Sequence, residues 1–144
     1  MIHCDSNYKN SVINTRSLNK DPDTAKFQLE SKLTNLFSHL NKRTALVEDI
    51  SNIPPKAMMI FYAYGDEYSN SRYNGIILLL TYTFDIDLNK EKLKKLSNDY
   101  SLLSSLVEEK LTSEWSNEIH YDQLKPLLAR IANNIVLVDR EIGC

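Results

Sequence analysis

Glycine is scarce in this chain, with only three glycines among 144 residues, at positions 65, 75 and 143. The loops that cradle phosphate groups need several closely spaced glycines, so the sequence contains no nucleotide-binding loop of that kind. No serine stands in the G-x-S-x-G pattern of a nucleophile elbow either. These absences remove two of the motifs by which enzymes are most readily identified from sequence.

Cysteine is also rare. Cys4 and Cys144 stand near opposite ends of the chain and form no metal-binding spacing. A disulfide between them is disfavoured in a reducing cytosol, so we expect two free thiols. We expect no metal ion and no cofactor.

Long apolar runs are missing as well. A membrane-spanning helix needs about twenty consecutive apolar residues, and no run in the chain approaches that length. The first ten residues contain no basic segment followed by an apolar stretch, so no secretory signal is expected. We therefore expect a cytoplasmic protein with no membrane partner.

Charge of one sign is not in excess, because 17 basic residues face 19 acidic residues and the formal net charge is −2. Proteins that bind a nucleic-acid backbone carry a basic surface, so no nucleic-acid partner is expected. A hydrophobic content of 42% and a charged content of 25% are ordinary for a globular protein, and the length suits one domain.

The most informative segment contains five of the eight tyrosines. Two apolar, β-prone runs, residues 56–64 and 75–85, flank the polar loop 65–74. In the second run, alternate residues from Ile76 to Phe84 are apolar, which is the period of a strand with one buried face. The pattern predicts a β-hairpin in the interior of a sheet.

A helix is predicted before this hairpin. Asp21 is suited to cap its start, and Pro22 to its first position, where the missing N–H would be unpaired anyway. An apolar stripe at helical spacing runs over Leu29–Leu40, and the helix is expected to end near Asn41. The segment 44–53 is interpreted as a further helical turn.

The helical period returns after the hairpin. Residues 89–115 carry apolar side chains every three or four positions, as one long helix or as two helices with a break near residues 97–99. A short helix is predicted over residues 123–133, with Pro126 in its first turn. Residues 135–139 are predicted to form a third strand.

These elements predict an α+β fold. A small mixed or antiparallel sheet, made of the central hairpin and the C-terminal strand, is covered by helices in the order α-β-β-α-α-β. We expect residues 21–144 to form a single domain. Residues 1–20 are polar and lack periodicity, which predicts a flexible arm or, over residues 11–15, an edge strand.

One cluster combines a histidine with carboxylates. His120 is followed by Asp122 and preceded by Glu114 and Glu118. A metal or general-base site would need further groups from elsewhere in the fold. We interpret the cluster as a solvated loop in which Asp122 caps the last helix, with an enzyme that uses the His120–Asp122 region as an alternative.

The loop 65–74 is the candidate functional site. Tyr68 and Tyr73 are large rings in a polar segment, where nothing local requires them. Tyrosine and arginine often anchor protein interfaces, because they cover much area at modest entropic cost. A loop that folds back on its own sheet is the alternative. The candidate partner-binding residues are Asp66, Glu67, Tyr68, Arg72 and Tyr73, with Tyr62 and Tyr64 on the preceding run.

Small size, mild acidity and the absence of a catalytic motif favour a binding protein without catalytic activity. The specific hypothesis is an inhibitor of another protein, such as an immunity protein or antitoxin whose loop blocks the basic cleft of a cognate toxin. A non-catalytic structural or accessory subunit that self-associates, such as a phage component or a chaperone, is the alternative. The sequence leaves the oligomeric state open.

Overall fold

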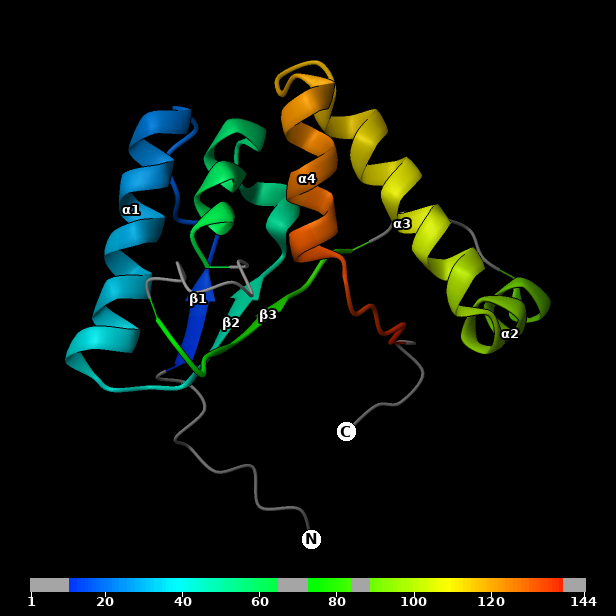
Figure 1. Cartoon of the computed structure of the whole chain (residues 1–144), viewed down its shortest axis with the longest axis horizontal. Coiled ribbons are helices and arrows are strands. Elements are labelled where there is room, and N and C mark those ends of the chain that lie inside the picture. The colour runs from blue at the N-terminus through cyan, green and yellow to red at the C-terminus, as the bar shows by residue number, and fades with distance from the viewer. Residues whose placement is uncertain (1–10, 65–72, 84–88, 139–144) are drawn as a thin grey trace, which may run out of the picture. The chain divides into compact units, whose positions relative to one another are not determined.

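The computed structural model describes residues 11–64, 73–83 and 89–138 (Figure 1). By its internal contacts the chain divides into two compact units, Met1–Phe84 and Asp85–Cys144. The first unit contains a sheet and its connecting helices, and the described part of the second is helical apart from its turns and an extended segment. The expectation of one domain over residues 21–144 stays a prediction.

The sheet of the first unit has three strands in the order β1-β2-β3, and both pairs of neighbours are parallel. Strand β1 is Val12–Asn14, β2 is Thr44–Glu48 and β3 is Ile77–Leu80. The mixed α and β content agrees with the predicted class. The predicted antiparallel hairpin is wrong, because all three strands run in the same direction.

Parallel strands cannot be joined by a tight turn, and each connection here is long and contains helical segments. Helix α1 (Pro22–Thr34) and the π-helical turn η2 (Asn35–His39) connect β1 to β2. The 3-10 helices η3 (Ile50–Asn52) and η4 (Pro55–Tyr62) begin the connection from β2 to β3. Helices α1 and η4 pack against each other and lie above the strands in Figure 1.

The run 56–64 is the main difference from the predicted fold, because it belongs to η4 and not to a strand. Pro55 occupies the first position of η4. Its nitrogen carries no hydrogen, which costs nothing there, because an N–H at a helix start has no helical hydrogen-bond partner. The buried residues of η4 recur at helical and not alternating spacing, so one face of a helix meets the core. They are Ala57, Met58, Ile60 and Phe61.

Strand β2 takes the place that was assigned to a helical turn. Its residues alternate between exposed and buried, with Ala45 and Val47 completely buried. That two-residue period is typical of a strand. Strand β1 confirms the edge-strand alternative for residues 11–15. Residues 135–138 form no strand, and the predicted residue 139 lies outside the described residues.

The predicted start of α1 is confirmed. The Asp21 carboxylate accepts a hydrogen bond from the backbone N–H of Thr24 at 2.9 Å, and Pro22 occupies the first helical position. At the other end, the N–H of Leu40 bonds to the carbonyl of Asn35, which widens the last turn. Asn41 then adopts a left-handed conformation with φ of 49°, which ends the helix where the sequence predicts.

The second unit contains three helices in its described residues, α2 (Lys90–Asn98), α3 (Tyr100–Trp115) and α4 (Tyr121–Ile131). Asp99 separates α2 from α3, and its carboxylate accepts a hydrogen bond from the N–H of Leu102 at 3.0 Å. The alternative of two helices with a break is thus confirmed. The buried side chains recur at the predicted helical spacing and include Leu96, Leu103, Val107, Leu111, Trp115, Leu124, Leu127 and Leu128.

Helix α4 begins two residues earlier than predicted. His120 is the residue before its first turn and makes no side-chain capping bond, so the assignment of Asp122 as the cap is wrong. Asp122 instead lies within the first turn, where a negative charge interacts favourably with the helix dipole. With this start, Pro126 lies in the second turn and not in the first. No helix in the described ranges is long and apolar enough to cross a membrane.

Candidate binding surface

Three aromatic rings of the first unit gather at the two ends of the segment 65–72. The Tyr64 and Tyr73 rings are stacked with centroids 5.9 Å apart and an interplanar angle of 19°. Phe37, from the π-helical turn η2, lies 6.2 Å from Tyr64 and 5.4 Å from Tyr73. We call Phe37, Tyr64 and Tyr73 the ring cluster.

Polar contacts also hold Tyr73 and Asn74, the residues that follow the segment 65–72. The hydroxyls of Tyr73 and Ser38 are hydrogen bonded at 2.9 Å. The Arg43 guanidinium donates to the carbonyl of Asn74 at 2.9 Å. Gly75 then turns with φ of 69°, a conformation that most other residues rarely adopt, and the chain enters β3.

The ring cluster therefore brings together Tyr64 and Tyr73, the residues on either side of the segment 65–72. Tyr64 and Phe37 are buried and Tyr73 is half-buried, so the cluster joins the core of the unit to its surface. Tilted and stacked aromatic pairs at these distances each stabilise a fold by about 0.5–1.5 kcal/mol beyond the burial of their area. The two residues that bracket the segment are fixed relative to each other by these contacts.

One face of the sheet carries a second group of apolar side chains. The strand register pairs Val12 with Leu46 and Leu46 with Leu79, so these three residues form a row on the same face. Leu79 is 52% exposed, and Ile77, two residues earlier on that face, is 59% exposed. Parallel sheets in proteins almost always have both faces covered, so an apolar row with this exposure is unusual.

Polar side chains meet at the carboxyl end of the strands, where many parallel sheets bind ligands. Thr15, which follows β1, donates its single hydroxyl proton toward the carbonyls of Glu48 and Asp49 and accepts from the Asn52 amide. The N–H of Asp49 bonds to the Thr81 hydroxyl at 2.8 Å. Because these groups bond to one another and to the main chain, they tie the strand ends together.

Asp49 itself has a left-handed backbone, with φ of 53°. Aspartate tolerates this conformation better than most residues, because its short carboxylate bonds to nearby backbone groups. Here the carboxylate accepts from the Ser51 hydroxyl at 2.6 Å and from the Ser51 N–H at 3.3 Å. The side chain is thus used to form the turn into η3.

The His120–Asp122 pair is present in the second unit. His120 Nδ1 lies 3.4 Å from an Asp122 oxygen, but the two side chains are 77% and 84% exposed. Among the residues that the structure describes, no group of three or more histidine, cysteine or acidic side chains converges as a metal site would require. The contact has the character of a solvated surface pair.

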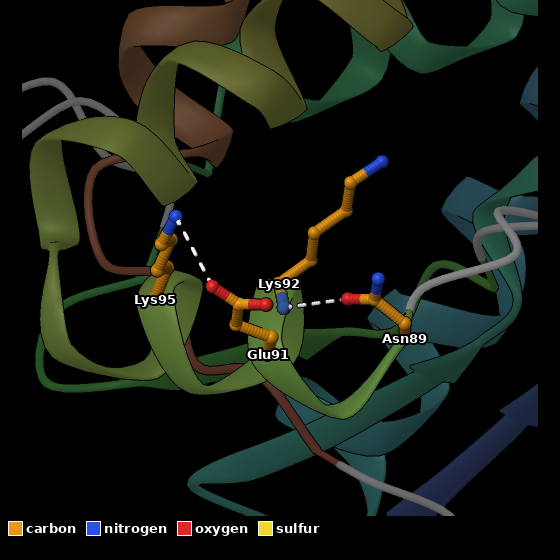
Figure 2. A network of polar contacts seen from close by, with 4 residues as sticks. All are labelled: Asn89, Glu91, Lys92 and Lys95. Carbon is orange, nitrogen blue, oxygen red and sulfur yellow. Dashed lines mark hydrogen bonds and ion pairs between the residues drawn. The ribbon is translucent and has the colours of Figure 1, made fainter.

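The second unit also carries a shallow depression of about 470 Å³ beside α2 and α3. Glu91 and Lys95 are among the residues that line it, and they pair at 3.7 Å (Figure 2). Figure 2 also shows the start of α2, where the Asn89 side chain accepts from the N–H of Lys92 at 2.9 Å. Both charged groups of the pair are largely exposed, so water screens them. The Asn89 contact caps the start of α2, and the Glu91–Lys95 contact is an ion pair on the surface of the same helix.

Within the described ranges, one ionisable group has a clearly shifted pKa. The Thr24 hydroxyl, and secondarily the Thr24 N–H, donate hydrogen bonds to Asp21 and lower the pKa of its carboxyl. Asp21 is the N-cap residue of α1, so its lowered pKa results from the hydrogen bonds that cap this helix.

No family model matches the chain, and no curated protein matches it. Functional assignment therefore depends on the residues of this chain alone.

The seven candidate residues from the sequence have different positions. Tyr64 and Tyr73 meet in the ring cluster, and Tyr62, at the end of η4, is half-buried. Tyr73 packs against Phe37 and Tyr64 of its own unit and bonds to Ser38, so this ring has a structural role. Asp66, Glu67, Tyr68 and Arg72 lie outside the described residues.

Sequence reasoning missed the residues that hold Tyr73 and the apolar row. Phe37 and Ser38 were interpreted only as part of a helix, and Leu46 was assigned to a helical turn. The signal for Leu46 was the alternation of Thr44–Glu48, which is a strand period. No sequence signal pairs Phe37 with Tyr73, because contacts between residues so distant in the chain follow from the topology.

Proposed function

We propose that this protein acts by binding another protein, and that it is an inhibitor of the immunity-protein or antitoxin type. The segment 65–72 is the proposed contact with the partner. The observation that carries the proposal is the ring cluster, which fixes Tyr64 and Tyr73 at the base of this segment.

A fixed base favours binding for a physical reason. Association costs free energy because loops and side chains lose conformational freedom, and a loop whose ends are already held loses less. Tyr68 and Arg72 are of the residue types that most often dominate binding energy, and Asp66 and Glu67 suit a basic partner surface. Loops on rigid scaffolds are common carriers of function.

The proposal includes no catalytic role. Catalytic acids and bases are usually shifted in pKa by burial and by specific charged neighbours. The His120–Asp122 pair is exposed to water on both sides, and the polar groups at the carboxyl end of the sheet are bonded to one another. These features suit surface and structural roles.

A direct test uses the proteins encoded by the two genes that flank this one. Each is expressed with an inducible promoter in a host cell, alone and together with the full chain. The proposal expects one of the two to arrest growth, and the full chain to restore it. Restoration is expected to be lost with Tyr68→Ala and kept with Tyr121→Ala, because Tyr121 is an exposed tyrosine in the other unit. Growth that neither neighbour affects, or protection that survives Tyr68→Ala, contradicts the proposal.

A further inference from the structure

Strand β3 forms one edge of the sheet, since β2 is its only neighbour among the described residues. The N–H of Ile77 donates to the carbonyl of Arg43, the residue before β2, at 2.7 Å. The N–H of Thr81, the residue after β3, donates to the carbonyl of Val47 in β2 at 3.0 Å. Backbone groups point alternately to the two sides of a strand. Leu78 and Leu80 therefore direct their N–H and C=O groups away from β2, at the open edge.

The side chains of β3 make this edge unusual. Edge strands are normally protected from pairing with other chains by a charged side chain, a proline, a bulge or very short length. Strand β3 has only four residues, ILLL, so short length is the one such protection its sequence shows: it contains neither a charge nor a proline, and Ile77 and Leu79 are more than half exposed. Strand β1, at the opposite edge, has three residues and ends in the Thr15 network.

We propose that β3 of one chain pairs antiparallel with β3 of a second copy, across a two-fold axis, to give one continuous sheet. This inference is independent of the proposed inhibitor function. A two-fold contact places the same surface on both sides. A strand can therefore form this contact only if its hydrogen-bonding groups, charges and side chains are complementary to those of an identical strand.

Strand β3 meets that condition for three reasons. It presents donors and acceptors at Leu78 and Leu80, so each copy supplies what the other needs. No like charges meet when ILLL is placed beside ILLL, whereas a charged edge would repel its own copy. The exposed Ile77 and Leu79 side chains lie on one face and become cross-strand neighbours of the same residues in the other copy.

The strand is short, so the contact is small and the dimer is expected to be transient. Sedimentation velocity of the full chain across a concentration series, up to about 1 mM, measures it directly. The expected result is a monomer–dimer equilibrium. Leu79→Lys and, independently, Ile77→Lys are expected to weaken dimerisation at least about tenfold. Phe27→Lys is the matched control, because Phe27 is 73% exposed on α1, away from β3.

A measurement on the unmodified protein keeps the proposal testable if a lysine variant fails to fold. Amide hydrogen exchange at Leu78 and Leu80 is expected to slow as the concentration rises, because these N–H groups gain partners in the dimer. A monomer at every concentration overturns the proposal. So does a dimer that both lysine variants leave unchanged, or exchange at Leu78 and Leu80 that is independent of concentration.

Discussion

The ring cluster leads to a quantitative prediction for Tyr73. Replacing Tyr73 by alanine removes two ring contacts, to Phe37 and Tyr64, and the hydroxyl contact with Ser38. Each aromatic pair contributes about 0.5–1.5 kcal/mol, and a neutral hydrogen bond contributes about 0.5–1.5 kcal/mol. These three contacts together contribute about 1.5–4.5 kcal/mol. Because the ring is only half-buried, we expect a value in the lower part of that range, below the cost of about 3–5 kcal/mol for truncating a fully buried phenylalanine. We expect Tyr73→Ala to destabilise the first unit by about 2 kcal/mol.

The assay has to separate the two units. Hydrogen exchange at the amides of Ala45 and Val47 in β2 reports on the first unit, since these residues belong to its core. The fluorescence of Trp115, the only tryptophan of the chain, reports on the second unit. Tyr73→Ala is expected to speed exchange in β2 in native buffer and to leave the Trp115 unfolding curve in urea nearly unchanged.

Two milder variants divide the effect into its parts. Tyr73→Phe keeps the ring and removes the hydroxyl, so it is expected to cost about 0.5–1.5 kcal/mol. Ser38→Ala removes the other partner of the same hydrogen bond. In a double-mutant cycle the two changes are expected to be non-additive, because they act on one contact. Stability of Tyr73→Ala within about 0.5 kcal/mol of the unmodified protein would refute the structural role of the ring cluster.

Two further predictions concern the polar contacts of the first unit. Thr15→Val keeps the shape of the side chain but removes the hydroxyl that donates toward the Glu48 and Asp49 carbonyls and accepts from the Asn52 amide. The Asn52 amide and the Asp49 carbonyl still bond to each other, so the main loss is at Glu48, and the change is expected to cost about 1 kcal/mol in urea unfolding. Equal loss in Thr15→Ser, which keeps the hydroxyl, would contradict this. The pKa of the Asp21 carboxyl is lowered in the folded protein. The ionised carboxylate therefore stabilises the fold at pH values above the pKa of the unfolded carboxyl. This stabilisation is lost as the pH falls through the lower pKa of the folded protein. The unfolding curves of the unmodified protein and Asp21→Asn are therefore expected to differ near neutral pH and to approach each other in acid, and a constant difference at all pH values would contradict the capping role.

The helices could be predicted from sequence because their signals are local. Asp21 and Pro22 fix the start of α1, and Asp99 separates α2 from α3, through bonds between residues only a few positions apart. Such contacts follow from the order of residues along the chain. The start of α4 shows the limit, since His120 stands at the N-cap position without a side-chain capping bond, and helix ends are uncertain by one or two residues when no cap marks them.

The sheet could not be predicted in the same way. Whether residues 56–64 become a strand or a helix depends on what they pack against, and short apolar runs suit both structures. Once η4 packs on α1, the connection to β3 becomes a crossover, and β3 must run parallel to β2. The partners of the candidate site follow from this topology, because Phe37 and Tyr73 are brought together only when the crossovers are in place.

The proposed inhibitor function requires that the segment 65–72 binds another protein. Isothermal titration calorimetry with the growth-arresting neighbour as the probe tests it most directly. Loss of a tyrosine that anchors an interface typically weakens binding at least about tenfold. We expect that result for Tyr68→Ala, with Tyr121→Ala binding like the unmodified protein. Equal affinity of Tyr68→Ala and the unmodified protein would contradict it.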